Sequence, residues 1–385
     1  MAIVVQKYGG SSVADPEKIG QVASHIAATK AAGHDVVVVV SAMGKTTENL
    51  LTLARSMAKD PPRRELDMLV STGERVTMAL VSMALSALGC DAVSFTGSQS
   101  GIITNDRHFD AQIIEVRPHR IEDELARGRV VIVAGYQGMS YRREITTLGR
   151  GGSDTTAVAL AAALGAERCE IYSDVDGIYS ADPRNVADAR HLPTIDYETM
   201  QEMAESGAKV LNARAVDWAA RHNIRIHARR TADFAAQGSG RETRVEASTS
   251  AQPAAIVLDA QLAWVDAPSA ARARVLVAVQ ASGAPIRDAW FGERVCLLLS
   301  LTSVPDFEVH KKLLTDAGAE QLRCDVAAVS VVAVGVGRDP TQVGRALDCI
   351  PPSALASSVS PLRLSTVVPR DDAPALEQAW HALFA

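Results

Sequence analysis

The sequence predicts an α/β protein, with a parallel sheet covered by helices on both faces and then a smaller region of two ferredoxin-like units. The sheet is predicted by continuous apolar runs that alternate with helical patterns, at 3–5, 36–40, 130–134 and 170–172. Runs without polar alternation are typical of parallel strands buried on both faces. A stretch of small polar residues at 232–254 then interrupts the pattern. We therefore expect a first domain at 1–231, a linker at 232–254 and a second region at 255–385.

Two helices are predicted in the first domain. Near-helical spacing of apolar residues ends at Gly89 and includes Val76, Leu80, Met83, Ala84 and Leu88. The stretch 154–164 predicts a second helix, with Ser153 or Asp154 as N-cap and Gly165 just beyond its end. Its first turn directs free backbone N–H groups toward whatever the preceding glycines surround.

The second region alternates two kinds of pattern. Strand-like runs lie at 274–279, 295–301, 326–336 and 362–368, and helical patterns lie at 307–316, 341–349 and 373–383. The length of 255–385 is enough for two small ferredoxin-like units.

Composition points to a small-molecule partner. The chain has 385 residues and a formal net charge of −6, and its Lys and Arg residues are spread along the sequence. Proteins that bind nucleic acids usually carry a concentrated basic patch, so we expect no nucleic-acid partner.

The cysteines and the apolar runs bear on localisation. The five cysteines are widely separated, and His222 and His227 lack an upstream C-x-x-C that would complete a zinc site. We read the cysteines as core thiols in a reducing compartment. No leader precedes Val4, and no apolar run approaches the ~18 residues of a membrane helix. The expected location is the cytoplasm, without a membrane partner.

The opening stretch KYGGSSV is a candidate phosphate cradle. Lys7 ends a strand, and Gly9, Gly10, Ser11 and Ser12 follow before a helical pattern. Glycines let backbone N–H groups approach phosphate oxygens, and Lys7 could contact a transferred phosphoryl group. An ordinary strand–turn–helix is the alternative for this motif alone.

A second glycine–lysine string is a decoy. Gly44-Lys45-Thr46 ends like a Walker A loop, but Val39 stands where that loop needs its first glycine. We interpret Lys45 as part of a polar loop.

A second candidate cradle is TLGRGGSDTT at 147–156. Arg150 is suited to bidentate binding of a carboxylate, and Ser153 and backbone amides can donate to the same anion. Two cradles at strand ends suggest a phosphate donor and an anionic acceptor that face each other.

Four further residues have ordinary structural readings on local sequence alone. In IYSDVDGIYSADPR, Tyr179 could hold a purine and Arg184 phosphates, or the segment could be a hairpin-like connection. Glu74 could cap its helix or bind an ammonium group. Lys209 reads as a solvated surface lysine.

Seven motifs together resemble the aspartokinases, enzymes that phosphorylate the β-carboxylate of L-aspartate with ATP. They are KYGGSSV, VVVSAMG, STGERV, SFTGSQSGI, VAGYQG, TLGRGGSDTTAVALAAALGA and CEIYSDVDGIYSADPR, in this order. The resemblance covers residues 1–230 almost continuously. It implies the amino-acid kinase fold, with ATP and Mg²⁺ as cofactors, and the first step of aspartate-family amino-acid biosynthesis, which leads to lysine and threonine.

The resemblance also implies roles for individual residues. Aspartate would be held by Thr47, Glu74, Arg150, Gly152 and Ser153. The nucleotide would be held by Lys7, Gly9, Gly10, Ser11, Ser41, Ser173, Asp174, Tyr179, Asp182, Arg184 and Lys209. Lys7, Asp154 and Lys209 would be catalytic, with Asp154 orienting Lys7 near the magnesium. No residue is assigned as a dedicated metal ligand.

The second region departs from the family pattern. Aspartokinases of this kind end in paired ACT domains that bind lysine or threonine and inhibit the kinase. Here the Asp-x-Pro-Gly turn of the first unit is missing, with DAPSA at 266–270 nearest to it, and the asparagine-rich effector segment is not recognisable. GVGRDPTQVGRAL at 335–347 resembles the opening of the second unit. We expect divergent tandem ACT-like units that respond weakly to lysine and threonine and form a homodimer or higher homo-oligomer.

Two alternatives remain at this level. A catalytically silent amino-acid sensor would be free to lose one of the five residues Lys7, Glu74, Arg150, Asp154 and Lys209, all of which are present. A kinase for another acidic amino acid, such as glutamate, would differ in the depth of its cavity.

Overall fold

The computed structural model describes residues 1–234, 240–247 and 254–384. They form two compact units. The first comprises the described residues of Met1–Ile178, Leu192–Met200 and Val210–Ser250, and the second comprises those of Tyr179–His191, Gln201–Lys209 and Ala251–Ala385. Two segments of the predicted first domain, 179–191 and 201–209, therefore pack with the C-terminal residues.

The first unit is built on an eight-stranded sheet in the order β12-β14-β13-β9-β1-β2-β6-β3. The strands are β1 (Ile3–Tyr8), β2 (Asp35–Val40), β3 (Ala92–Phe95), β6 (Val130–Ala134), β9 (Arg168–Ser173), β12 (Thr194–Asp196), β13 (Ile226–Arg230) and β14 (Glu242–Glu246). Neighbours run parallel except β13 and β14. The predicted parallel-rich sheet is confirmed, and all four predicted apolar runs are strands.

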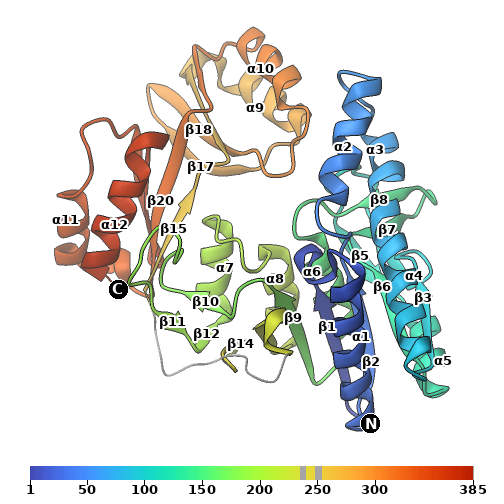
Figure 1. The fold of residues 1–385 in the computed structure, drawn as a ribbon. Coiled ribbons are helices and arrows are strands. Elements are labelled where there is room, and N and C mark those ends of the chain that lie inside the picture. The colour runs from blue at the N-terminus through green and yellow to red at the C-terminus, as the bar shows by residue number, and fades with distance from the viewer. Residues whose placement is uncertain (235–239, 248–253, 385) are drawn as a thin grey trace. The chain divides into compact units, whose positions relative to one another are not determined.

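Helices cover both faces of this sheet (Figure 1). Val36, Val38 and Val40 pack with α1 (Pro16–Ala31) and α4 (Thr72–Ala87) in one buried cluster. Because side chains alternate along a strand, Val37 and Val39 point to the other face and are equally buried. That face is covered by α6 (Gly152–Ala163), which contacts β1, β2 and β9 and packs on α8 (Ala213–His222).

Shorter elements surround the sheet. They are η1 (Gly10–Val13), α2 (Thr46–Met57), α3 (Arg63–Val70), α5 (His119–Ala126), α7 (Tyr197–Glu205) and η2 (Thr231–Phe234), the four-stranded sheet of β5 (Ile113–Val116), β4 (Ile102–Thr104), β7 (Gln137–Ser140) and β8 (Ile145–Thr147), and the pair β10 (Ile178–Tyr179) and β11 (His191–Leu192).

The two predicted helices exist with earlier starts. The helix α4 begins at Thr72 and α6 begins at Gly152, so the N-cap of α6 is Gly151 and not Ser153 or Asp154. Gly151 has φ +71°, which favours glycine, and this turn starts the helix early enough to place Ser153 and Asp154 in its first turn.

The helical stretch 63–87, which includes α3 and α4, is long and apolar enough to span a membrane by length and composition alone. This differs from the expectation that no such stretch exists. Val70, Val81 and Leu85 of this stretch are fully buried within the first unit, whereas Val76 and Met83 are 54% and 65% exposed.

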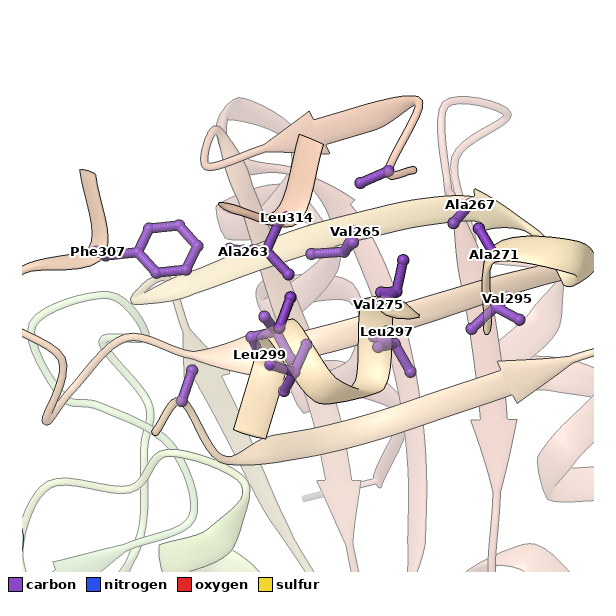
Figure 2. Close-up of a cluster of buried hydrophobic side chains, with 14 of the residues drawn as sticks. Ala263, Val265, Ala267, Ala271, Val275, Val295, Leu297, Leu299, Phe307 and Leu314 are labelled. Carbon is purple, nitrogen blue, oxygen red and sulfur yellow. The ribbon is translucent and has the colours of Figure 1, made fainter. Parts of the chain in front are cut away.

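The C-terminal unit contains two four-stranded antiparallel sheets. The first has the order β17-β18-β16-β19, with β16 (Leu262–Pro268), α9 (Arg272–Ser282), β17 (Ile286–Phe291), β18 (Arg294–Ser300), α10 (Phe307–Asp316) and β19 (Gln321–Arg323). This is a ferredoxin-like β-α-β-β-α-β arrangement. Figure 2 shows its core, in which Val275 of α9 and Leu314 of α10 pack over Val265, Leu297 and Leu299 of the sheet.

The second sheet has the order β15-β20-β22-β21 and is also ferredoxin-like. Its elements are β15 (Ala255–Asp259), β20 (Val326–Val332), η4 (Val336–Arg338), α11 (Pro340–Leu347), β21 (Ala356–Val359), β22 (Arg363–Pro369) and α12 (Ala373–Phe384). Its fourth strand is β15, which precedes all strands of the first ferredoxin-like sheet in sequence and pairs antiparallel with β20. The two ferredoxin-like units are therefore interleaved in sequence and not strictly tandem.

One predicted strand is wrong. Residues 274–279 lie inside the helix α9. The alternating valines predicted a strand, but Val275, Ala278, Val279 and Ser282 are buried at helical spacing while Val277 is 65% exposed. Tertiary packing on one helical face overrides the β preference of valine here.

The predicted linker 232–254 contains a β-strand. Residues 235–239 and 248–253 lie outside the described residues. The part between them contains β14, where Glu242 accepts hydrogen bonds from Arg229 and contacts His227 of the neighbouring β13. Short polar strands give little periodic signal, which is why the composition of this segment predicted a loop.

Val275→Ala and Val277→Ala are a matched test of α9. Loss of the buried Val275 methyl groups should lower the local unfolding free energy by about 2 kcal/mol, whereas Val277→Ala should change it by less than ~0.5 kcal/mol. Hydrogen exchange of peptides from β16 and β18 measures this energy. Equal effects would contradict the helix, because residues 275 and 277 share a face only in a strand.

Candidate active site

The carboxyl ends of three neighbouring strands meet at one edge of the main sheet. Tyr8 of β1 lies opposite Val40 of β2, and Val40 lies opposite Ala134 of β6. The chain leaves these strands in glycine-containing turns, as is typical of ligand sites in parallel sheets.

An ion pair stands at this edge. Lys7 Nζ of β1 lies 2.6 Å from Asp154 Oδ1 in the first turn of α6. Both residues are buried, at 9% and 7% exposure. Two charges removed from water are tolerated only when they are paired, and a carboxylate in the first turn of a helix is further stabilised by the helix dipole.

Gly10 leaves no space for a side chain. A Cβ on Gly10 would lie 2.9 Å from the carbonyl oxygen of Ala42, and Gly10 O accepts a hydrogen bond from Gly44 N at 3.0 Å. Gly9 N donates to Tyr172 O at 3.1 Å. The two loops are thus held close by their backbones, and the decoy string Gly44-Lys45-Thr46 lies beside the cradle as a connection into α2.

Hydrogen bonds connect the first cradle to the second. Ser41 Oγ donates to Ser153 Oγ at 3.0 Å, and Ala42 N donates to Glu74 Oε1 at 3.1 Å. A Cβ on Gly135, just after β6, would lie 2.8 Å from Ser153 Oγ. The residues that follow β1, β2 and β6 therefore form one contiguous site with the starts of α4 and α6.

Glu74 is a buried carboxyl group with an unused acceptor. It is 3% exposed, and its Oε2 atom is buried without a hydrogen-bond partner among the described residues. Burial raises the pKa of Glu74 to about 7, against the smaller lowering effect of its backbone hydrogen bonds. A cation such as an ammonium group would supply the missing partner and favour the ionised form.

Arg150 presents its charge to solvent while its backbone is held. Its side chain is exposed and forms no hydrogen bond or ion pair within the described part of the chain. Arg150 O accepts a hydrogen bond from Asn212 Nδ2 at 2.9 Å, and Asn212 Oδ1 accepts from Thr155 Oγ1 and Arg214 N. Asn212, the N-cap of α8, therefore fixes the loop that carries Arg150.

The glycines of this loop are required by close packing. A Cβ on Gly151 would lie 2.6 Å from Asn212 Nδ2, and a Cβ on Gly152 would lie 2.7 Å from Leu148 Cβ. Gly152 thus permits close packing, and its contacts do not indicate a role in ligand binding.

Sequence reasoning missed three residues around the site. Tyr136 adopts φ +69° directly after Gly135, and burial raises the pKa of its hydroxyl, with Glu74 adding to the shift. Buried Asp67 interacts with His108 Nδ1 at 2.6 Å and accepts hydrogen bonds from Phe109 N and Thr147 Oγ1, so it orders the segment before Arg150. Asn212 is the third. Of these three, only Tyr136 could have been found from the sequence, because it lies inside the motif VAGYQG.

The remaining predicted residues of the first unit lie at loop and helix starts. Thr47 is half-buried in the first turn of α2, and Ser11 is exposed in η1. Ser173 ends β9 and accepts a hydrogen bond from Val175 N through its Oγ at 3.3 Å, and Asp174 follows it in an exposed position.

Four predicted nucleotide residues lie in the second unit. Asp182 and Arg184 form an ion pair at 2.7 Å, and this pair together with Lys209 lowers the pKa of Asp182. Tyr179 stacks edge-on against His191 at 5.4 Å between ring centroids. Arg184 and Lys209 are exposed. Within residues 1–234, 240–247 and 254–384, no group of three or more His, Cys, Asp or Glu side chains is arranged to hold a metal.

Comparisons with known proteins agree with the geometry. The model of the amino acid kinase family matches residues 2–229. Aspartokinase of Mycobacterium tuberculosis is 62% identical over 230 residues, which are 60% of this chain and 55% of that protein. Aspartokinase of Thermus thermophilus is 40% identical over 400 residues, covering 100% of this chain and 99% of that protein. The chain thus spans about half the length of its mycobacterial relatives and nearly all of the Thermus one.

Solved structures extend the likeness over both units. E. coli aspartokinase III in complex with aspartate and ADP (R-state) matches with a TM-score of 0.85 at 25% identity over 99% of both chains. The same enzyme in complex with lysine and aspartate (T-state) matches with a TM-score of 0.74 at 26% identity.

Glu74→Gln should change the pH dependence of stability. Unfolded Glu74 ionises near 4.5, but the folded carboxyl group keeps its proton to about 7. The wild-type protein therefore loses stability as pH rises through this window, by about 3 kcal/mol in total at pH 8. Glutamine cannot ionise, so the variant should gain stability relative to wild type between pH 5 and pH 8.

Urea unfolding at pH 5 and at pH 8 measures the difference in the free energy of unfolding between Glu74→Gln and the wild type. Glu48→Gln is the control, because Glu48 is exposed on α2 and should give the same small effect at both pH values. A Glu74→Gln effect that is independent of pH would contradict the raised pKa.

Proposed function

We propose, because this chain belongs to the aspartokinases of the amino acid kinase family, that it transfers the γ-phosphoryl group of ATP to the β-carboxylate of L-aspartate. The product is 4-phospho-L-aspartate, the first intermediate of the aspartate family of amino acids. The observation that carries the proposal is the contiguous site in which the Lys7–Asp154 ion pair lies beside Ser153 and Glu74. E. coli aspartokinase III, which binds aspartate and ADP, supports it.

Aspartate has a suitable binding partner for each of its ends. Glu74 offers a buried free carboxylate oxygen to the α-ammonium group. Arg150 offers an unpaired guanidinium to the α-carboxylate, with Ser153 and Thr47 as further donors. These contacts leave the β-carboxylate toward the phosphate cradle.

The nucleotide has a cradle and a loop. Gly10 and Ser11 offer backbone N–H groups to phosphate oxygens next to Lys7, and Gly9 lies beside them with its own N–H donated to Tyr172 O. Ser41, Ser173, Asp174, Tyr179, Asp182, Arg184 and Lys209 complete the proposed nucleotide set.

The chemistry needs charge neutralisation and no general base. A carboxylate with an ordinary pKa of ~3.9 is already ionised at neutral pH. The residues must instead hold two mutually repelling anions in line and neutralise charge on the leaving phosphate oxygens, which Lys7 and backbone N–H groups do. Asp154 orients Lys7 through their ion pair.

The site fits Mg²⁺, the expected metal of an ATP-dependent transferase. Magnesium prefers oxygen ligands and usually binds through one or two carboxylates together with phosphates and water, and Asp154 is a carboxylate beside the cradle. When bound, Mg²⁺ would add positive charge at the phosphates.

The C-terminal unit bears on regulation and assembly. We expect weak inhibition by lysine and threonine, because the Asp-x-Pro-Gly turn and the asparagine-rich segment are missing, although lysine binds the E. coli enzyme. We expect a homodimer or higher homo-oligomer located in the cytoplasm. Edge strand β17, with exposed Ile286 and Phe291, supports association through the C-terminal unit.

Acyl phosphate trapping with hydroxylamine tests this function. With ATP and Mg²⁺, L-aspartate should give hydroxamate at least ~10-fold faster than L-glutamate, since one extra methylene is discriminated by about that much. Lysine plus threonine should lower the rate only weakly. No hydroxamate from aspartate would favour a silent sensor, a preference for glutamate would reassign the substrate, and strong inhibition would overturn the regulatory proposal.

A further inference from the structure

The segment 179–191, here called the nucleotide loop, packs inside the C-terminal unit. It contains Tyr179, Asp182 and Arg184, which the proposed function assigns to ATP, and the inference below rests on that function. Although the loop precedes the linker in sequence, its described contacts are with the second ferredoxin-like sheet and with α12.

Apolar side chains bury the base of the loop. Ala181 and Val186 are 5% and 4% exposed and lie in one hydrophobic cluster with Leu376 and Trp380 of α12. Trp380 is itself fully buried, and its Nε1 donates to Ala346 O of α11 at 3.1 Å. The base of the loop is therefore part of the core of this unit, unlike a typical surface connection.

Polar contacts then fix the loop on α12, and they include Gln378 Nε2, which donates to Asn185 O at 3.3 Å, and His381 Nδ1, which lies 3.7 Å from Asp188 Oδ1. Ser180 Oγ lies 2.9 Å from His381 Nε2, and both residues are buried. Asn185 Nδ2 donates to Glu377 Oε2 at 3.0 Å, and Glu377 is 1% exposed. These contacts join residues almost 200 positions apart, and both partners on α12 lie one helical turn from each other, on the face toward the loop.

Asn185 is rigidly connected to the proposed nucleotide contacts. Asn185 N and Val186 N both donate to Asp182 O at 2.9 Å, which forms a tight turn. In the same turn Asp182 accepts from Arg184 N at 3.0 Å and pairs with its guanidinium. A shift of Asn185 would therefore move Asp182 and Arg184 with it.

Glu377 has no other evident purpose. Its second oxygen, Oε1, is buried without a hydrogen-bond partner among the described residues, and burial raises its pKa to about 7. A buried acid with half of its acceptor capacity unused is costly for stability. This cost has a physical reason if the position of Glu377 supports the nucleotide loop.

We propose that Glu377 and His381 of α12 are positioning residues for ATP, which hold the nucleotide loop in its binding geometry through Asn185 and Ser180. The C-terminal unit then contributes directly to nucleotide affinity, without any effector bound. It acts on the nucleotide and leaves the aspartate residues, which lie in the first unit, unaffected.

Asn185→Ala and Glu377→Ala, alone and together, test the pairing. Each single variant should raise the Kd of a fluorescent ADP analogue and the KM for ATP by about 5- to 10-fold, which corresponds to the net contribution of about one hydrogen bond. KM for aspartate should stay constant. The double variant should bind the ADP analogue as tightly as either single variant, because each single substitution already removes the one hydrogen bond between the two residues.

Controls separate positioning from general damage. Asn185 is exposed, so its variant should fold even if Glu377→Ala does not, and Glu308→Ala removes an exposed carboxylate of α10 away from the loop. Unchanged nucleotide affinity in Asn185→Ala, or an equal rise in the KM for aspartate, would overturn the proposal.

The two proposals fail separately. If the wild-type chain binds the ADP analogue but phosphorylates neither aspartate nor glutamate, the proposed reaction fails while the affinity shift still decides the role of α12. If it binds no nucleotide at all, both are wrong.

Discussion

The ion pair between Lys7 and Asp154 is the interaction on which the rest of the site depends. Its two buried charges lie 2.6 Å apart, and each would be strongly destabilising without the other. Keeping them paired requires that the end of β1 and the first turn of α6 stay in fixed register. The close packing at Gly10, Gly135 and Gly151 serves this purpose, because any Cβ there would push the loops apart. The same register places a lysine charge, a helix N-terminus and glycine backbones at one point, which is what transfer of a phosphoryl group between two anions requires.

The C-terminal unit is connected to the chain more deeply than a domain appended after a linker. Its second sheet takes a strand, β15, from before its first sheet, and its core takes in residues 179–191 of the kinase sequence. Arg363 of β22 adds ion pairs to Glu202 at the end of α7 and to Asp288 of β17. The second ferredoxin-like sheet and α12 thus share a hydrophobic core with Ala181 and Val186 of this segment.

Much of the first unit could be predicted from sequence because its signals are local. Unbroken valines gave β2, and the glycines beside Lys7 and Arg150 marked both cradles. The failures come from contacts between distant residues. Asn212 binds Arg150 O across 62 positions and Glu377 binds Asn185 across 192, and no spacing rule reveals such pairs. Val277 shows a related limit, since its exposure on α9 is decided by which face the sheet covers. β14 was missed for want of an apolar pattern.

The most direct measurement is kcat of Lys7→Met at saturating ATP and aspartate, with Lys7→Arg as the variant that keeps the charge. Circular dichroism should first establish that the variants fold, and Lys7→Met/Asp154→Asn provides a charge-free pair if the single variant does not. If Lys7 neutralises the transferred group, kcat should fall by at least ~100-fold in Lys7→Met and recover in part in Lys7→Arg. A folded Lys7→Met variant with kcat close to that of the wild type would contradict the central role given to this ion pair.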